Sequence, residues 1–232
     1  QINGIGLHTG VKTKAIFKPA PENFGIRFKR LDLDNCPEII ADIDHVIDIS
    51  RGTTIGQHDF KIHTVEHILS AIYGLEIDNI LIELTNKEPP VLDGSAKPFV
   101  DILLESGILN QNVPRNELII DKTITYCDPI KGIDIHILPS DKFRITFMTD
   151  YKSEFLGTQY TAMYSLKDDF IEEFAPARTF CLFSEIVHLN KIGLIKGGSL
   201  ENAIVFVDEN LKENSTNKLN KIFNTNIDFT VD

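Results

Sequence analysis

The spacing of apolar residues changes about a quarter of the way along the chain, and this change restricts the fold to those that combine sheets with helices. Before that point apolar and polar residues alternate at 14–19 and 25–30, which predicts a β-hairpin around the polar turn at 20–23. Further strands are expected at 38–41 and 45–48. The spacing then becomes that of an amphipathic helix, with apolar side chains at Val65, Ile68, Leu69, Ile72 and Tyr73. The chain is therefore predicted to be α+β.

The expected ends of two helices are marked by residues typical of such positions. Thr64 is predicted to cap the first helix and Gly74 to end it. After a strand at 79–84, Ser95 is predicted to cap a second helix that ends at Gly107. The first half of the chain thus contains several strands and two helices.

A polar connector at 108–115 is the best candidate for a domain boundary. Beyond it, a second predicted hairpin repeats three features of the first, namely a strand ending in Pro, a polar turn and an alternating strand with an early Arg. We therefore predict two domains of similar α+β topology, 1–113 and 114–232. In the second half the pattern predicts strands at 117–120, 123–126, 134–139, 143–148 and 203–207 and helices at 168–174 and 180–189.

Composition excludes several classes of protein. The 34 Asp and Glu outnumber the 23 Lys and Arg, and a net charge of −11 argues against a nucleic-acid-binding surface. With 42% hydrophobic residues the chain can form a core, so it is not disordered. Cys36, Cys127 and Cys181 form no pairing motif, which fits a reducing cytoplasm. No apolar run approaches the ~20 residues of a membrane helix, so we expect no stable membrane insertion.

One short motif predicts metal chemistry. His63 and His67 stand four residues apart at the start of the first predicted helix, with Glu66 directly before the second. Histidines at this spacing on a helix project to one side, where a nearby carboxylate can take a proton from an attacking water. The letters also satisfy the H-x-x-E-H pattern of zinc peptidases. The motif alone leaves open whether the site is a metal site at all.

Five motifs in a fixed order support a more specific interpretation than the His-Glu-His pattern alone. They are 4–10 (GIGLHTG), 64–67 (TVEH), 92–96 (LDGSA) followed by Pro98 and Phe99, 177–180 (ARTF) and 197–203 (GGSLENA). In this order and spacing they resemble UDP-3-O-acyl-N-acetylglucosamine deacetylases, the zinc amidases of lipid A biosynthesis. The resemblance runs from residue 4 to about residue 207.

The resemblance implies a fold of two α+β domains, each a β-sheet layered on two helices, with the active site between them. A small insertion in the first domain would correspond to about 47–62. A β-α-β insertion in the second, at about 176–208, would shape an apolar passage for an acyl chain. These expectations agree with the boundary at 113 and with the two similar hairpins.

The resemblance also implies roles for individual residues. His67 matches a zinc ligand and Glu66 the general base, whereas His63 matches no ligand. Thr179 matches a residue that contacts the tetrahedral intermediate, and Leu7 and His8 lie in a loop near the metal. Phe180 would touch the acyl or sugar portion of the substrate. Positions that would line the acyl passage, for which core packing is the alternative, are Leu182, Ile186, Ile195, Ser199, Ala203 and Val205.

The implied activity is hydrolysis of the acetamide of UDP-3-O-(hydroxyacyl)-N-acetylglucosamine by a cytoplasmic Zn²⁺ enzyme, expected to be a monomer. A catalytic zinc needs about three protein ligands, and His67 is one. The family takes the others from an H-x-x-x-D helix, followed by a second-domain His, and no such pattern occurs here. We therefore expect these residues beyond Asp232, and expect the 232 residues alone to be inactive.

Two alternatives stay open. A zinc metallopeptidase would use His63, Glu66 and His67 together. A catalytically dead module would keep the acyl-binding passage without a working metal site. Some members of the family also carry a C-terminal hydroxyacyl-carrier-protein dehydratase, which would add a second activity to the same polypeptide.

Overall fold

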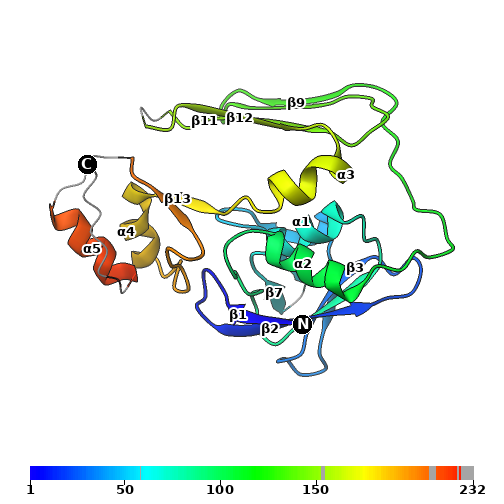
Figure 1. The fold of residues 1–232 in the computed structure, drawn as a ribbon, viewed down its shortest axis with the longest axis horizontal. Coiled ribbons are helices and arrows are strands. Elements are labelled where there is room, and N and C mark those ends of the chain that lie inside the picture. Colours follow the sequence, from blue (N-terminus) through cyan, green and yellow to red (C-terminus); the bar gives the residue numbers. More distant parts are fainter. Residues whose placement is uncertain (58, 153–154, 209–212, 224, 226–232) are drawn as a thin grey trace.

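The computed structural model describes residues 1–57, 59–152, 155–208, 213–223 and 225 (Figure 1). Its largest unit is a five-stranded sheet in the order β1-β2-β8-β3-β4. Strands β3 and β8 are parallel and the other neighbours are antiparallel. The strands are β1 (Ile2–Ile5), β2 (Lys12–Pro19), β3 (Ile26–Arg30), β4 (Glu38–Ile40) and β8 (Ile80–Leu84). The α+β class predicted from the sequence is confirmed.

The first predicted hairpin is wrong in its pairing, although both of its strands exist. Strand β8 lies between β2 and β3 and bonds to both, so those two strands are not neighbours. Strand β8 is buried along almost its whole length, with Ile82 and Leu84 fully inaccessible. A strand with so little exposed surface is stabilised most at the centre of a sheet, where it has neighbours on both sides. Alternation in β2 and β3 predicts their faces but carries no information about this partner.

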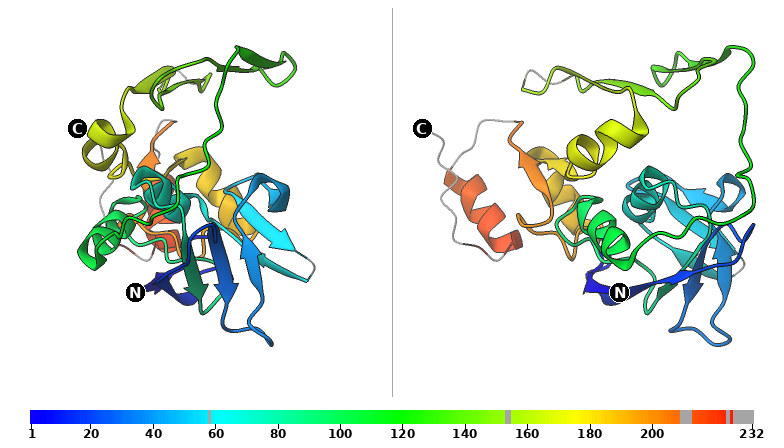
Figure 2. Two further views of the ribbon diagram at one scale, coloured as in Figure 1. Left: turned by 90° about the vertical axis from the view of Figure 1, so that its right-hand side faces the viewer. Right: turned by 45° about the vertical axis from the view of Figure 1, so that its right-hand side comes forward.

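Helices α1 (Glu66–Gly74) and α2 (Lys97–Ser106) pack against the sheet (Figures 1 and 2). Phe28, Ile82, Ile68, Ile72 and Phe99 are fully buried where the sheet and helices meet, and they belong to one hydrophobic cluster. Burying each such side chain contributes about 1.5–3 kcal/mol. This core fixes the start of α1, which carries the Glu66–His67 pair.

The start of α1 differs from the prediction, whereas the ends of α2 lie close to the predicted residues. Thr64 is not the cap of α1, because Val65 occupies that position and Thr64 has a left-handed backbone with φ 55°. The Thr64 hydroxyl instead donates to Glu88. At α2 the Ser95 hydroxyl accepts from the Lys97 N–H, one residue before the assigned cap, and Gly107 ends the helix with φ 80° as expected.

Between β4 and α1 the chain forms a separate small sheet. It follows the short 3₁₀ turn η1 (Ile43–His45) and consists of β5 (Val46–Asp48), β6 (Thr54–Gln57) and β7 (Phe60–Ile62) in antiparallel order. The segment leading from β5 to β6 contains Ser50 and Arg51, which reach the functional site.

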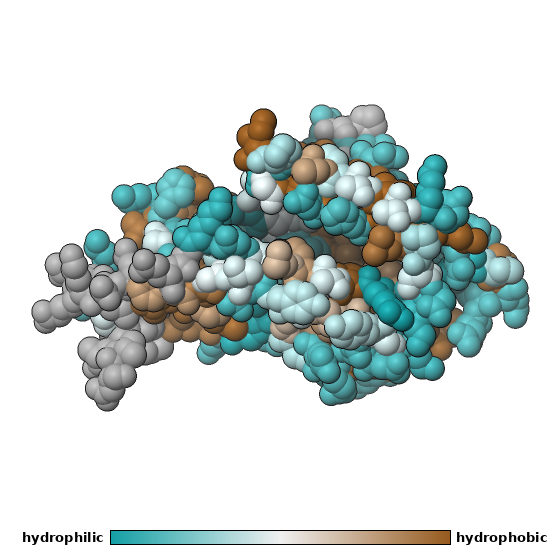
Figure 3. Space-filling view, turned by 90° about the horizontal axis from the view of Figure 1, so that it is seen from above, coloured by the Kyte–Doolittle hydropathy of each residue, from teal (hydrophilic) through white to brown (hydrophobic). Residues whose placement is uncertain are grey.

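The second half begins with two antiparallel ribbons. One pairs β9 (Ile124–Asp128) with β10 (Ile133–Ile137), and the other pairs β11 (Ile145–Asp150) with β12 (Thr158–Met163). The predicted pairing of 134–139 with 143–148 is therefore wrong, and 117–120 is not a strand. The ribbons lie at the edge of the molecule (Figures 1 and 2), where apolar and polar side chains are both exposed (Figure 3). The two-layered second domain stays a prediction.

A helical segment and a β-α-β unit complete the described chain. Helix α3 (Leu166–Asp169) continues into the π-helical turn η2 (Phe170–Phe174), close to the predicted helix. The predicted helix at 180–189 is instead a strand followed by a helix, and the strand expected at 203–207 is present and parallel to the first. These elements are β13 (Phe180–Leu182), α4 (Phe183–Lys191), β14 (Ile204–Phe206) and α5 (Glu213–Phe223). Phe183, Ile186 and Leu219 bury one another in a second hydrophobic cluster.

Candidate active site

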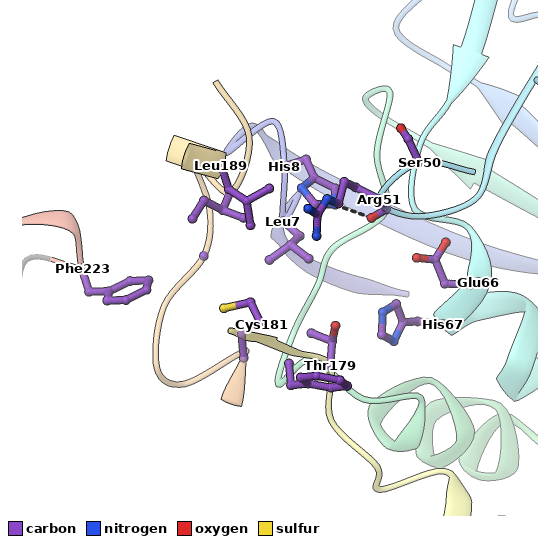
Figure 4. Close-up of a pocket in the computed structure, with 14 residues that line it drawn as sticks. Leu7, His8, Ser50, Arg51, Glu66, His67, Thr179, Cys181, Leu189 and Phe223 are labelled. Atoms are coloured by element: carbon purple, nitrogen blue, oxygen red, sulfur yellow. Dashed lines mark hydrogen bonds between the residues drawn. The ribbon is translucent and has the colours of Figure 1, made fainter. Parts of the chain in front are cut away.

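A cavity of about 320 Å³ lies where the first half of the chain meets the β-α-β unit (Figure 4). It takes its walls from the loop at 6–10, the start of α1 and the segments at 179–181 and 195–203. Several residues singled out in the sequence line it together: Leu7, His8, Glu66, His67, Thr179, Phe180, Ile195 and Ala203. Residues far apart in the sequence therefore converge on one space.

Glu66 is the carboxylate of this cavity. Its Oε2 accepts a hydrogen bond of 2.9 Å from the Thr53 N–H. Gly52 also packs closely against this carboxylate, since a Cβ at residue 52 would lie 2.9 Å from Oε1 of Glu66. None of the residues that the structure describes donates a hydrogen bond to Oε1. One oxygen thus orients the carboxylate while the other stays available as an acceptor.

His67 lies beside Glu66 and its ring points into the cavity, toward Thr179 (Figure 4). Burial lowers the pKa of His67 below its ordinary value, and the opposing effect of the nearby Glu66 and Asp93 carboxylates is smaller. The imidazole is therefore neutral near pH 7. A neutral imidazole is the form that binds a metal ion.

Thr179 is held in place by its backbone. Its N–H donates to the Gly94 carbonyl at 2.7 Å, and its own carbonyl accepts from the Ile204 N–H at 2.9 Å. The preceding residue, Arg178, donates to the carbonyls of Asp93 and Leu200 at 2.7 and 3.1 Å. These bonds tie the start of the β-α-β unit to the turn before α2. They set the position of the Thr179 side chain opposite His67.

His8 and Arg51 close one side of the cavity. Because the Arg51 carbonyl can only accept, the 3.0 Å contact means that Nε2 of His8 carries the proton. The buried Nδ1 of His8 has no hydrogen-bond partner among the described residues. The Arg51 guanidinium pairs with Glu185 of α4 at 2.8 Å. Arg51 thus links the small sheet to the β-α-β unit.

The opposite end of the cavity is apolar. Leu189, Cys181 and Phe223 lie there (Figure 4), and Ile195 also lines the cavity. Burial raises the pKa of the Cys181 thiol to about 11, so the group is a neutral wall and not a nucleophile at pH 7. An elongated apolar group is the kind of ligand that fits this end.

Sequence reasoning missed several of these lining residues. A signal existed for two of them: Leu189 stands three positions after the buried Ile186 on α4, and Phe223 stands four after the buried Leu219 on α5. The others are Ser50 and Arg51, which lie between β5 and β6, Cys181 in β13, and Gly198 in the turn before β14. No local pattern marked Ser50, Arg51 or Cys181, whereas Gly198 stands in the 197–203 motif without having been singled out.

Some residues expected to line the acyl passage lie elsewhere. Ile186 is fully buried in the second hydrophobic cluster, and Val205 packs against that cluster. Ser199 forms a turn in which its N–H donates to Asn202 at 2.8 Å. Leu182 ends β13 and pairs with Phe206. The structure therefore gives these four residues packing and turn contacts and does not bring them to the cavity wall.

His63 and His67 do not share a face, contrary to the expectation from their spacing. Helix α1 begins at Glu66, and the left-handed Thr64 breaks the helical register between the two histidines. His63 contacts the Thr54 hydroxyl at 3.1 Å and lines a neighbouring cavity of about 270 Å³. Across the described ranges, no cluster of three His, Cys, Asp or Glu side chains suited to a metal ion is formed.

Comparisons with known proteins identify a family and several relatives of the chain. The model of the family described as UDP-3-O-acyl N-acetylglycosamine deacetylase matches residues 1–221. The chain is 52% identical over 219 residues to a protein of Chlorobaculum tepidum named bifunctional enzyme LpxC/FabZ, covering 94% of this chain and 47% of that protein. It is 38% identical over 218 residues to the protein of the same name from Porphyromonas gingivalis, with the same coverage.

A third relative carries the deacetylase name alone. It is the UDP-3-O-acyl-N-acetylglucosamine deacetylase of Myxococcus xanthus, 37% identical over 209 residues, which are 90% of this chain and 66% of that protein. The chain thus spans about half the length of the bifunctional relatives and about two thirds of this one. The family match extends over nearly the whole chain, including both halves of the cavity. The chain therefore belongs to the UDP-3-O-acyl N-acetylglycosamine deacetylase family.

Proposed function

We propose that the protein containing this chain hydrolyses the acetamide of UDP-3-O-(hydroxyacyl)-N-acetylglucosamine and releases acetate. The observation that carries the proposal is the shared cavity, which has Glu66 and His67 at one end and apolar side chains at the other. A carboxylate beside a neutral imidazole suits hydrolysis, and the apolar end suits the acyl chain of the substrate. Membership of the deacetylase family supports the same conclusion.

Glu66 is the proposed general base. Its Oε1 takes a proton from the attacking water as the water oxygen bonds to the acetamide carbon, while Thr53 holds Oε2. The same carboxyl group then returns the proton to the nitrogen as the carbon–nitrogen bond breaks, so the products are acetate and an amine. Thr179 lies opposite His67, where its hydroxyl can donate to the oxygen of the tetrahedral intermediate.

His67 fits as one ligand of a catalytic Zn²⁺, since burial keeps its imidazole neutral. When bound, such an ion polarises the substrate carbonyl and makes water a better nucleophile at neutral pH. The described residues offer no complete set of three ligands. We assign none of the described residues to the remaining ligand positions or to the acid or electrophile of the second domain.

The apolar end of the cavity is the proposed site of the acyl chain. Leu189 and Phe223 lie there, and Phe180, Ile195 and Ala203 also line the cavity. Each methylene buried there would contribute about 0.8 kcal/mol to binding. The Nδ1 atom of His8 is a buried polar atom with no partner among the described residues, and a hydroxyl of the substrate could supply one. The hydroxyacyl group thus has both apolar and polar counterparts in this chain.

The same cavity supports the proposed division into domains at 113. Its walls come from residues before the connector, such as Leu7 and Glu66, and after it, such as Thr179 and Ala203. We therefore place the active site between a domain at 1–113, with an insertion at about 47–62, and a domain at 114–232, with one at about 176–208. A cytoplasmic monomer is the proposed state. Of the helices described, none has the length and apolar composition needed to span a bilayer.

Two rival functions make different demands on these residues. A peptidase built on the H-x-x-E-H letters needs His63 and His67 to bind one ion, and their separate cavities disfavour it. A dead acyl-binding module needs no base. The available acceptor oxygen of Glu66 favours the enzyme over that module.

The test is release of acetate from the nucleotide-sugar substrate by the full-length protein loaded with Zn²⁺. Replacing Glu66 by Gln is expected to lower kcat by about 10²–10⁴-fold while the fold and bound zinc are kept. His67→Ala is expected to reduce zinc stoichiometry, and His63→Ala serves as the matched control with a mild effect. Full activity of Glu66→Gln would contradict the proposed role of the base, and loss of activity in His63→Ala would favour the peptidase arrangement.

A further inference from the structure

Glu88 is a fully buried carboxylate that lies outside the cavity and has no part in the reaction described above. A carboxylate without solvent is costly unless its oxygens are satisfied by donors. Burial alone would raise the pKa of Glu88, but hydrogen bonds from His8, Thr9 and Thr64 together hold that pKa below its ordinary value. The side chain is therefore an anion at neutral pH, and it accepts four hydrogen bonds.

The donors come from two separate parts of the active site. Oε1 accepts from the His8 N–H at 3.0 Å and from the Thr64 hydroxyl at 2.8 Å. Oε2 accepts from the Thr9 N–H at 2.9 Å and from the Thr9 hydroxyl at 2.6 Å. Oε1 thus joins the loop that carries Leu7 and His8 to the residue two positions before Glu66.

The loop at 6–10 is shaped to receive this carboxylate. A Cβ at Gly6 would lie 2.3 Å from Oε2 of Glu88, so only glycine permits the approach. On its other side the loop accepts hydrogen bonds, at the Leu7 carbonyl from the Gly197 N–H at 3.0 Å and at the His8 carbonyl from the Lys196 N–H at 3.3 Å. The loop is therefore held between Glu88 and the turn that carries Ile195 and Gly198 of the cavity wall.

Thr64 is the second point that Glu88 fixes. Its backbone is left-handed, with φ 55°, a conformation that costs a β-branched residue free energy and needs support from its surroundings. The hydroxyl bond to Glu88 supplies such support immediately before α1 begins. The orientation of the Glu66–His67 pair depends on where this turn places the first residues of the helix.

We propose that Glu88 is a positioning residue, which sets the His8 loop and the Glu66–His67 helix start in register with each other across the cavity. The proposal rests on the proposed deacetylase function for its kinetic consequences, but the ordering of the loop can be measured without activity. Because a backbone N–H, which can only donate, faces each oxygen of Glu88, the site requires two acceptor oxygens. An amide, which has one acceptor and one donor group, cannot satisfy it.

The test compares Glu88→Gln with Glu83→Gln in the full-length protein. Glu83 is a matched control, because it is also buried and lies on β8, the strand that precedes Glu88 in the chain. Its carboxylate pairs with Lys18 at a distance of 2.8 Å, and this ion pair does not line the cavity. Hydrogen exchange of the amides of His8 and Thr9 is expected to become about tenfold faster or more in Glu88→Gln. It is expected to stay within about twofold of wild type in Glu83→Gln. Kinetically, kcat is expected to fall about 10–100-fold in Glu88→Gln, since small misplacements of reacting groups are costly.

A second pair of variants isolates the helix arm. Thr64→Val removes the hydroxyl donor and Thr64→Ser keeps it, so kcat is expected to fall in the first and to be restored in the second, with KM changed less than kcat. A merely structural role would lower thermal stability without this recovery of kcat. Equal kcat in the two Thr64 variants overturns the proposal. This test still applies if Glu88→Gln does not fold. Unchanged exchange at His8 and Thr9 in a folded Glu88→Gln also overturns it, whereas an inactive wild-type enzyme with altered exchange would count against the deacetylase function alone.

Discussion

Replacing Gly94 by Ala should destabilise the protein more than an ordinary glycine replacement in a turn. Gly94 has φ 84°, and a Cβ there would lie 1.9 Å from the carbonyl oxygen of Asn202. Left-handed backbone costs a residue with a Cβ about 1–2 kcal/mol. Since the clash is with backbone, the two turns must separate, and the 2.7 Å bond from the Thr179 N–H to Gly94 is the first to be lost.

The expected size follows from these contacts. Separating the turns also weakens the bond from Arg178 to the Leu200 carbonyl, and each lost hydrogen bond costs about 1 kcal/mol. Together with the backbone term, Gly94→Ala should lower the free energy of unfolding by about 3–4 kcal/mol. The matched control is Gly132→Ala, at φ 67° with open space around it, which should cost only the backbone term of about 1–2 kcal/mol.

Urea unfolding followed by circular dichroism measures both variants, and thermal melts should separate them by about 4–8 °C. Acetate release should fall in Gly94→Ala, because Thr179 loses the bond that sets its position, and stay near wild type in Gly132→Ala. The reasoning is refuted if the two variants differ by less than about 0.5 kcal/mol, a value within ordinary scatter. In that case the contact between residues 94 and 202 does not position Thr179.

Two further outcomes depend on burial. Burial lowers the pKa of His63, with Lys61 adding to the effect, so the unfolded chain binds the proton first as the pH falls below about 6.5. Stability should therefore decrease from pH 7 toward pH 5, and His63→Asn should flatten that decrease in denaturation measured across this range. An unchanged slope would assign the effect to other groups. Burial also raises the pKa of Cys181 to about 11, so at pH 8 iodoacetamide should label the exposed Cys127 well before Cys181, as read by peptide mass spectrometry. Labelling of Cys181 first would place that thiol outside the apolar wall.

The predicted strands and helices were mostly found, but their partners often were not. Residues 14–19 and 25–30 are strands, yet β8 separates them in the sheet. Alternation reports which face of a strand is buried and says nothing about which strand lies beside it. The second predicted hairpin failed for the same reason, since β10 and β11 each pair with a different neighbour.

The start of α1 shows a different kind of failure. Thr64 has the side chain of a helix cap, but its hydroxyl donates a hydrogen bond to Glu88, 24 residues later. No property of the residues next to Thr64 reports that partner. The left-handed turn at Thr64 also keeps His63 off the helical face that carries His67. The wrong cap and the wrong histidine pair therefore have the same origin, a turn whose hydroxyl bonds to a distant residue.

Which residues line the cavity could be predicted where a motif fixes its own local shape and not where packing decides. Glu66 and His67 are adjacent on one helix turn, so finding the helix located both. The apolar wall depends on which side of α4 faces the cavity, and there Leu189 lines it while Ile186 is buried in the second cluster. Both leucine and isoleucine satisfy the same helical spacing, so spacing alone could not choose between them.

Glu88 connects these two kinds of result. Its neighbours in sequence, Lys87 and Pro89, carry no signal of chemistry, and its carboxylate does not line the cavity. Yet it accepts hydrogen bonds from the loop at 6–10 and from Thr64, which belong to two separate sequence motifs. Motifs identify segments whose local conformation is special, and a special conformation needs a partner that stabilises it. In this protein that partner is one buried anion, so the geometry of the cavity depends on a residue that no motif contains.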